Sequence, residues 1–351
     1  VHSAMPGVQA ARLCPQAIFV WSGPAEYHKY SRMVTQIIEQ KIPVVEKASI
    51  DEFYLDLSGM DKYFSPFSYL VQLKQQIHAQ TGLPLSFALA ANKLISKIAT
   101  NEAKPNGQIE IPAGTEQAWL APLPVAKMPG CGSKTLALLQ QQGINTIGQL
   151  AATPPARLQK WLGKWGLDLA DKARGIDDSP VQPHHEAKSI SAEETFAEDT
   201  DDLSFLEQEL ARLTEKVGYQ LRQEGKLAGC VAIKLRYENF ETLTRQEIIP
   251  FTSSDRQFIQ KARDLLHQHY QRGRKLRLLG VRLSQLEANA IQLQLFDDAS
   301  AERLLHTAID DIKNTFGKHA IGRASSMAPP GSASRLPGQP LWINRTGEEL
   351  D

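Results

Sequence analysis

Two adjacent carboxylates, Asp51 and Glu52, are the residues of this sequence best suited to chemistry. They lie between an apolar segment at 42–45 and an alternating segment at 53–57, the pattern of an acid pair where two strands join. Consecutive strand residues point to opposite faces, so the pair can share a metal ion only if the chain turns there. Carboxylates at such a corner suit Mg²⁺, and two metal ions suit phosphoryl transfer. Taken alone, the pair favours a solvated Asp-Glu turn, so other segments must decide.

A second candidate is the corner at 103–107 (Ala-Lys-Pro-Asn-Gly), which follows a predicted helix at 92–103. Proline ends the helix and glycine relaxes the turn, so Lys104 projects from a defined position. We expect the helix to turn its apolar residues toward a sheet, which leaves Lys93, Lys97 and Lys104 free. An ammonium group at this corner could hold a triphosphate. A solvated Lys at a helix C-terminus is the alternative, and this segment alone favours it.

A glycine-rich hairpin at 128–135 (Met-Pro-Gly-Cys-Gly-Ser-Lys-Thr) precedes a helix with three leucines. Gly130 and Gly132 allow backbone N–H groups to approach a phosphate, and the helix N-terminus at Ser133 and Lys134 favours its negative charge. This is a helix-hairpin-helix arrangement, which contacts the DNA backbone and reads no base sequence. An ordinary pair of antiparallel helices is the alternative. The two glycines together with the lysine favour DNA contact.

Positive charge is concentrated in residues 211–290, which hold fifteen Lys and Arg and eight Asp and Glu. Lys234 and Arg236 alternate with apolar residues, so one face of this strand is predicted to be apolar and the other basic. Arg274 and Arg277 belong to a cluster that opens the last predicted strand. A basic sheet face can follow a duplex backbone. A solvated charged face is the alternative.

A short apolar motif at 292–296 (Gln-Leu-Gln-Leu-Phe) lies just after this basic region. Leu293, Leu295 and Phe296 could fill an apolar pocket of a partner protein, with Gln292 forming a hydrogen bond at its rim. A final edge strand of the preceding domain is the alternative. The placement of the motif outside the predicted core favours the partner.

The composition is that of a globular protein with several domains. The 351 residues are 42% hydrophobic and 22% charged, and the formal net charge is zero, so nucleic-acid binding must come from local patches. The three scattered cysteines have no metal-binding spacing and indicate a reducing cytoplasm. No apolar run approaches the roughly 18 residues of a membrane span, and no secretory leader is visible, so we expect no membrane partner.

We expect alternating strands and helices to position the acid pair and Lys104. The hairpin is expected to lie in an all-helical segment at about 115–176. The first elements are predicted at 17–21, 24–40, 65–80 and 85–90, where the first and last are strands. Residues 177–186 contain two prolines and no periodicity, which is typical of a linker. The pattern beyond them is strand, helix, strand, strand, helix, strand, a split βαβ domain. Its helices and last strand are predicted at about 203–221, 254–270 and 275–284.

In this order, the motifs resemble those of the Y-family translesion DNA polymerases, specifically the bacterial DNA polymerase IV branch, over 1–327. The resemblance implies an α+β multidomain fold shaped like a right hand, with an α/β palm, a helix-hairpin-helix thumb and a βαββαβ little finger. It divides the chain into a remnant of the fingers (1–20), the palm (21–114), the thumb (115–176) and a linker (177–187). The little finger (188–290), the clamp-binding motif (291–298), an amphipathic helical tail (299–327) and a disordered end (328–351) follow. Packing of the tail on the little finger and contact with a partner both stay open.

The resemblance also implies roles for the candidate residues in low-fidelity translesion synthesis on primer-template DNA. Asp51 is a metal ligand and Glu52 the neighbouring acid near the primer 3′-OH, in a site for two Mg²⁺ ions. Lys104 contacts the triphosphate of the incoming deoxynucleoside triphosphate. The DNA-binding residues are Gly130, Gly132, Ser133, Lys134, Lys188, Lys234, Arg236, Arg274 and Arg277. A sliding clamp binds Gln292, Leu293, Leu295 and Phe296, and the protein is a cytoplasmic monomer.

One feature departs from the family pattern. The family carries its first metal-binding Asp and its ribonucleotide-excluding aromatic residues on a first strand, and its fingers supply a Tyr and an Arg to the triphosphate. None of these precedes the turn-like segment at 1–6, so we expect the sequence to lack its natural start and to have little polymerase activity alone. Two rival functions are a non-catalytic clamp-binding accessory protein on the same fold and a helix-hairpin-helix DNA-binding module. The acid pair and Lys104 argue against the accessory protein, and the helix-hairpin-helix module leaves the acid pair unexplained.

Overall fold

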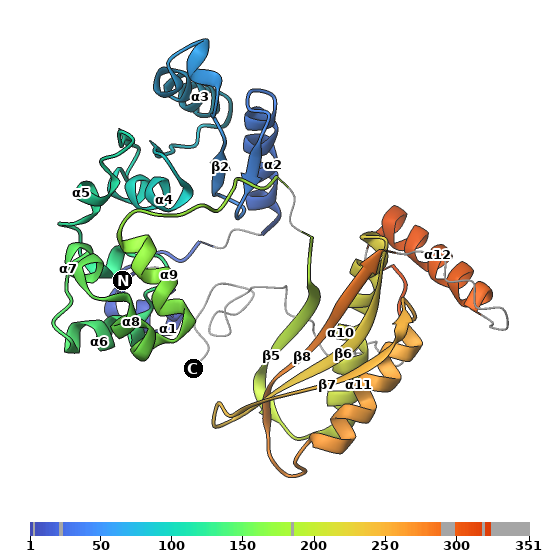
Figure 1. Ribbon diagram of the computed structural model, residues 1–351. Coiled ribbons are helices and arrows are strands. Elements are labelled where there is room, and N and C mark those ends of the chain that lie inside the picture. The colour runs from blue at the N-terminus through green and yellow to red at the C-terminus, as the bar shows by residue number, and fades with distance from the viewer. Residues whose placement is uncertain (3, 21–23, 184–185, 289–298, 318–319, 324–351) are drawn as a thin grey trace. The chain divides into compact units, whose positions relative to one another are not determined.

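A computed structural model describes residues 1–2, 4–20, 24–183, 186–288, 299–317 and 320–323 (Figure 1). The chain forms two compact units, one of residues 20–185 and one that joins residues 186–351 to residues 1–19, which contain α1 (Gly7–Leu13). The strand predicted at 17–21 is wrong for residues 17–20, which form no strand and leave Ile18 89% exposed. Trp21 lies outside the described residues. Within the described part, no helix is both long and apolar enough to cross a membrane.

The first half of the unit at residues 20–185 contains two small sheets. An antiparallel hairpin pairs Val45 with Leu55, and a parallel pair is linked through a helix, as is typical of a βαβ connection. Apolar side chains of α2, β1 and α3 form one core cluster. The elements in order are α2 (Pro24–Glu39), β1 (Val45–Lys47), β2 (Phe53–Leu55), the 3₁₀ turn η1 (Met60–Lys62), α3 (Pro66–Thr81), β3 (Phe87–Leu89), α4 (Lys93–Glu102) and β4 (Gln108–Glu110).

The second half of this unit is helical in its described residues, as predicted. Its helices share a core cluster with the buried face of α4, to which Ile95 and Ile98 contribute. The two halves are therefore joined by common packing and not only by the chain. The elements are α5 (Glu116–Leu120), the 3₁₀ turn η2 (Val125–Lys127), α6 (Ser133–Gln141), α7 (Ile147–Ala152), α8 (Pro155–Leu162) and α9 (Lys164–Ala173).

The other unit contains the predicted βαββαβ domain. Its four strands form an antiparallel sheet in the order β5-β8-β6-β7, and α10 and α11 pack on one face of it (Figure 1). The side chains of Val231, Ile233, Leu235 and Tyr237 are at most 1% exposed, which confirms the apolar face of β6. The elements are β5 (Ser189–Thr200), α10 (Leu203–Gln223), β6 (Lys226–Tyr237), β7 (Thr242–Thr252), α11 (Asp255–His269) and β8 (Leu276–Ala288).

The amphipathic segment that follows forms α12 (Ala299–Phe316). It packs back on the four-stranded domain, since Tyr219 and Arg222 of α10 form hydrogen bonds with Asn314 and Asp310. Residues 291–298 and 328–351, predicted to be a clamp-binding motif and a disordered end, lie outside the described residues.

Candidate functional site

The acid pair occupies the tight loop between β1 and β2. The N–H groups of Ala48 and Ser49 both donate to the carbonyl of Glu52, at 3.0 and 3.2 Å, so the chain turns where the shared-metal hypothesis requires a turn. Asp51 is exposed, and its Oδ1 accepts a 2.5 Å hydrogen bond from Ser49 Oγ. Ser49 Oγ in turn accepts from the N–H of Asp51 at 3.2 Å. The carboxylate of Asp51 is thus oriented by one neighbour and open to solvent.

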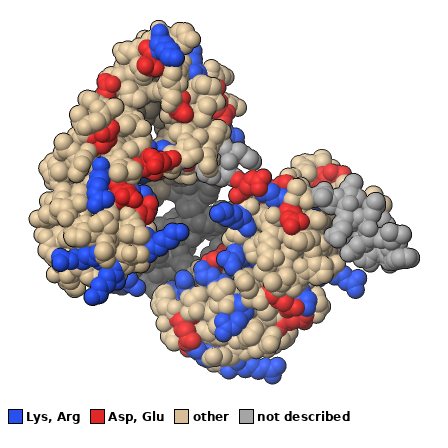
Figure 2. All heavy atoms as spheres, viewed as in Figure 1, with Lys and Arg blue, Asp and Glu red and all other residues tan. Residues whose placement is uncertain are grey.

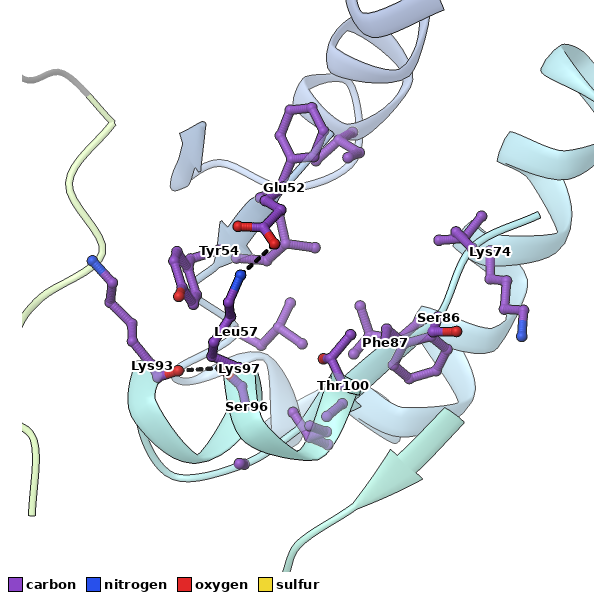
Figure 3. A pocket seen from close by; sticks show the side chains of 18 of the residues that line it. Glu52, Tyr54, Leu57, Lys74, Ser86, Phe87, Lys93, Ser96, Lys97 and Thr100 are labelled. Atoms are coloured by element: carbon purple, nitrogen blue, oxygen red, sulfur yellow. Dashed lines mark hydrogen bonds and ion pairs between the residues drawn. The ribbon is translucent and has the colours of Figure 1, made fainter. Parts of the chain in front are cut away.

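Two lysines of α4 reach across to this hairpin. Lys97 forms an ion pair with Glu52 (Figure 3), and Lys93 forms one with Glu46, at 2.6 Å to Oε2. The expectation that both lysines are free is therefore wrong. The sequence separations are 45 and 47 residues, so no local pattern reveals the pairing. Of the three lysines, only Lys104 matches the expectation, since its side chain forms no ion pair or hydrogen bond among the described residues.

The β2 tyrosine lies between these charged groups. Lys93 Nζ lies 4.8 Å from the ring centroid of Tyr54, within range of a cation–π interaction. Burial raises the pKa of Tyr54, and the negative charges of Glu52 and Glu46 raise it further. Tyr54 therefore stays protonated at neutral pH and cannot serve as a base there. Its ring instead helps to fix α4 against the hairpin.

A cavity of about 1660 Å³ opens beside the acid pair, within the unit at residues 20–185 (Figure 3). Asp51, Glu52, Lys97 and Lys104 all line it, together with apolar side chains of β2 and β3. The structure thus brings together the candidate metal ligands and the candidate triphosphate ligand. Ligand sites generally combine apolar walls with a few polar groups, and this cavity has both.

The corner that carries Lys104 is held by close backbone packing. A Cβ atom on Gly107 would lie 2.0 Å from the carbonyl oxygen of Ala103, so only glycine fits there. Lys74 of α3, which also lines the cavity, donates to the carbonyl of Asn106 at 2.6 Å. Sequence reasoning missed Lys74, because its role depends on a contact 32 residues away.

The predicted linker contains a segment that is tied to α4. Asp177 Oδ2 accepts from the N–H of Leu94 at 3.1 Å, and Asn92 Oδ1 accepts from the N–H of Ile95 at 3.0 Å. Two side chains therefore cap the helix that carries both lysines, and both cap residues also line the cavity. The N–H of Gln182 donates to Oε2 of Glu46, the carboxylate that forms the ion pair with Lys93 of α4. Residues 177–183 form no helix or strand.

The carboxylates of the acid pair are the type of ligand that binds Mg²⁺, but there are only two of them. Asp51 and Glu52 offer the hard carboxylate oxygens that Mg²⁺ prefers. Among the described residues, however, no group of three or more His, Cys, Asp or Glu could hold a metal ion together. The ion pair with Lys97 also competes for an oxygen of Glu52. These residues fit a metal that receives further ligands from water and from phosphate oxygens.

The glycine hairpin lies at the start of α6, as predicted. Gly132 is the N-cap, no side chain caps the helix, and Ser133 and Lys134 are exposed in its first turn. Gly130 has a φ of +85°, and an added Cβ would lie 3.1 Å from the ring of Trp165. The helix N-terminus therefore presents N–H groups and a cation to solvent, which suits a phosphate.

The helical segment that contains this hairpin is basic. Residues 126–177 contain seven Lys and Arg and three Asp. Figure 2 shows Lys and Arg side chains gathered over this helical part of the unit. Burial raises the pKa of the Cys131 thiol to about 11, so the hairpin adds no negative charge at neutral pH.

The predicted basic face of the four-stranded domain is partly neutralised. Lys234 forms an ion pair with Glu193 at 2.8 Å, and Arg274 forms one with Glu241 at 2.9 Å. Arg277 lies 3.5 Å from Asp199. The remaining two candidates, Arg236, which donates to Thr242, and the exposed Lys188, have no acidic partner among the described residues.

Sequence reasoning missed one cation on the open face of this sheet. Arg282 of β8 is exposed and lies opposite Ser191 of β5 and Ala232 of β6. It donates to Gln246 Oε1 at 3.4 Å, and the described residues supply no carboxylate to it. The sequence pattern could have identified it, since Arg282 lies between Val281 and Leu283, which are both buried, in a strand whose residues alternate between the two faces.

Family comparisons cover most of the chain. The impB/mucB/samB family matches residues 1–101, the impB/mucB/samB family C-terminal domain matches residues 187–295, and the thumb domain of DNA polymerase-iota matches residues 126–177.

Curated relatives match over most of the chain. The chain is 39% identical over 324 residues to a DNA polymerase IV of Dehalococcoides mccartyi, covering 92% of this chain and 83% of that protein. It is 36% identical over 329 residues to a DNA polymerase IV of Caulobacter vibrioides, covering 92% and 81%.

Solved structures share the fold. A Y-family DNA polymerase chimera superposes with a TM-score of 0.72 at 23% identity, covering 82% of this chain and 84% of that one. An insertion ternary complex of Dbh DNA polymerase gives a TM-score of 0.58 at 23% identity, covering 82% and 84%. Both support an α+β fold with thumb and little-finger domains.

Proposed function

This chain belongs to the Y-family DNA polymerases of the DNA polymerase IV type, and from that premise we propose how its residues serve translesion DNA synthesis. The reaction transfers a deoxynucleotide to a primer 3′-OH and releases pyrophosphate. The observation that carries the assignment of roles is one cavity lined by Asp51, Glu52 and Lys104. A carboxylate pair suits a metal-bound triphosphate when an ammonium group without an acidic partner in the described part lines the same cavity.

Asp51 and Glu52 would hold Mg²⁺ beside the primer end. When bound, the metal supplies charge neutralisation on the triphosphate and a lower pKa for the 3′-OH. Lys104, which has no acidic partner among the described residues, would hold a phosphate oxygen as a point charge. Lys97 would set the position of Glu52 through their ion pair.

DNA would be held mainly through its phosphates. Gly130, Gly132, Ser133 and Lys134 offer N–H groups and one ammonium at the start of α6. On the little finger, the proposed phosphate contacts are Lys188, Lys234, Arg236, Arg274, Arg277 and the newly identified Arg282. The partial pairing of these cations with carboxylates supports moderate affinity that falls as salt rises.

We also propose that residues 1–351 alone extend a primer slowly. Asp51 and Glu52 have no third metal-ligating side chain beside them in the described part, and Lys97 competes for Glu52. A two-metal site with so few carboxylates should bind Mg²⁺ weakly. Clamp binding at Gln292, Leu293, Leu295 and Phe296 remains a proposal from the sequence, since these residues lie outside the described part.

Single-nucleotide incorporation with the protein in excess over primer-template tests this function. We expect slow, template-directed, Mg²⁺-dependent incorporation that falls further in Asp51→Asn, while Asp61→Asn, an exposed carboxylate on the same cavity, changes little. Incorporation that ignores the template base would contradict the polymerase function. Fast incorporation by residues 1–351 would instead refute only the proposed weakness of the metal site.

Deletion of residues 292–296 should abolish stimulation by a sliding clamp and leave unstimulated incorporation intact.

A further inference from the structure

Helix α12 packs on the little finger with its polar side inward. His306, Asp310 and Lys313 are 3%, 7% and 9% exposed, and their spacing of four and three residues places them on one stripe of the helix. Amphipathic helices normally bury their apolar stripe and expose their polar one. The arrangement in α12 is the reverse.

A buried charge network explains this orientation. Arg222 of α10 donates from Nε to Asp310 Oδ2 at 2.8 Å and from Nη1 to Asp255 Oδ1 at 2.7 Å. Its remaining donors reach Ser253 O, Asp310 Oδ1 and Asp255 Oδ2. Desolvation alone would lower the pKa of Arg222, but the hydrogen bonds and charges of the two aspartates raise it. Removing one partner of a buried ion pair is strongly destabilising, so the bonds from Arg222 to Asp310 hold α12 with this face inward.

The neighbouring stripe of α12 is apolar and open to solvent. Leu304, Leu305, Ile312 and Phe316 are 72%, 55%, 37% and 75% exposed. Large contiguous apolar surfaces on a soluble domain mark interaction sites, whereas single exposed leucines do not. Four large side chains along one helix form such a surface, and the charge network prevents α12 from rotating to bury them.

The end of the described chain indicates what covers this stripe. Arg323 forms an ion pair with Glu215 of α10 at 3.1 Å, so the chain leaves from the domain on which α12 lies. Residues 324–351 contain one run of three large apolar side chains, at 341–343 (Leu-Trp-Ile). Seventeen residues separate this run from Arg323, and a random coil of that many residues has an r.m.s. end-to-end distance of about 23 Å.

This distance is comparable with the length of α12, since a helix of 18 residues is about 27 Å long. A tether of this length gives a local concentration in the millimolar range, which is enough to populate a weak apolar contact. Arg345 lies two residues beyond the run, and the exposed Asp311 lies seven residues after Leu304, on the border of the stripe.

We propose that the segment around Leu341, Trp342 and Ile343 docks on the apolar stripe of α12 in the same molecule. The docked tryptophan covers Leu304, Leu305, Ile312 and Phe316, and Arg345 faces Asp311. This contact is independent of DNA synthesis, so the proposal stands or falls separately from the assigned function.

Fluorine NMR of the full chain labelled with 5-fluorotryptophan tests the proposal. The resonance of Trp342 is assigned by its loss in Trp342→Phe. We expect it to be displaced from the position of a free peptide of residues 336–351 and to move to that position in Leu304→Ser/Phe316→Ser. Ile248→Ser, which removes a 70% exposed side chain from β7 of the same domain, should leave the resonance unchanged. Circular dichroism checks that each variant is folded.

Three results would overturn the proposal. The first is a Trp342 resonance at the free-peptide position in the unaltered chain. The second is a displaced resonance that the double variant does not move. The third is a displacement that grows with protein concentration, which would identify a second copy as the occupant. A displacement that is independent of concentration and is lost only in the α12 variant supports docking within one molecule.

Discussion

Substitution of Gly107 by alanine should disturb the Lys104 corner through space alone. The added Cβ would lie 2.0 Å from Ala103 O, and ordinary contacts begin at 3.4 Å, so the backbone must move by about 1.4 Å, the difference between the two. Over-packing of this kind costs roughly 1–3 kcal/mol of stability. Loss of the Lys104 contact, a hydrogen bond to a charged group, costs about 1.5–3 kcal/mol, or roughly 10- to 150-fold in triphosphate affinity.

Two assays separate these effects. Urea denaturation measures stability, and titration of a deoxynucleoside triphosphate into the DNA complex, with 2-aminopurine at the templating position, measures affinity. Gly114→Ala is the control, because its Cβ would meet nothing within 4 Å although its φ is +83°. It should lose about 1 kcal/mol of stability and keep its triphosphate affinity. Unchanged triphosphate affinity in Gly107→Ala would refute the reasoning that this corner positions Lys104.

Two further predictions concern the thumb hairpin. Lys134→Ala should weaken binding to duplexes of different sequence by a similar factor and reduce the slope of log affinity against log salt by about 1, as measured by fluorescence anisotropy; an unchanged slope would exclude a phosphate contact. Cys131, with its pKa raised to about 11, should be about one-thousandth thiolate at pH 8, and its alkylation by iodoacetamide should accelerate about tenfold per pH unit toward pH 11. Bound DNA should slow that alkylation, and equal rates with and without DNA would place the hairpin away from the duplex.

The sequence predicted those parts of the fold that depend on local periodicity. The helix predicted at 65–80 is observed at Pro66–Thr81, with Ser65 as its N-cap and with Leu70, Leu73 and Ile77 buried. Strand β4 was missed, because Gln108–Glu110 is three residues long and contains one apolar side chain. Residues 17–20 are apolar enough for a strand but lack a pairing partner among the described residues, which local sequence cannot reveal.

The candidate site shows the same division. The turn at Asp51 and the exposed Lys104 followed from nearby residues, whereas the partners of Lys93 and Lys97 lie 47 and 45 residues away. Charge alone could not predict those pairs, since a lysine on a helix is as well solvated as it is paired. The cap of α4 by Asp177 is likewise a contact across 83 residues. Tertiary packing decided each of these.

Metal affinity of the DNA complex tests the central assignment most directly, because it does not require turnover. Mn²⁺ binding would be followed by electron paramagnetic resonance, with residues 1–351 on primer-template and a non-hydrolysable deoxynucleoside triphosphate. Asp51→Asn should weaken binding at least about tenfold, by loss of a charged oxygen ligand, while Asp61→Asn binds as the unaltered chain does. Equal Mn²⁺ affinity in Asp51→Asn and the unaltered chain would contradict the assignment of the acid pair as the metal site.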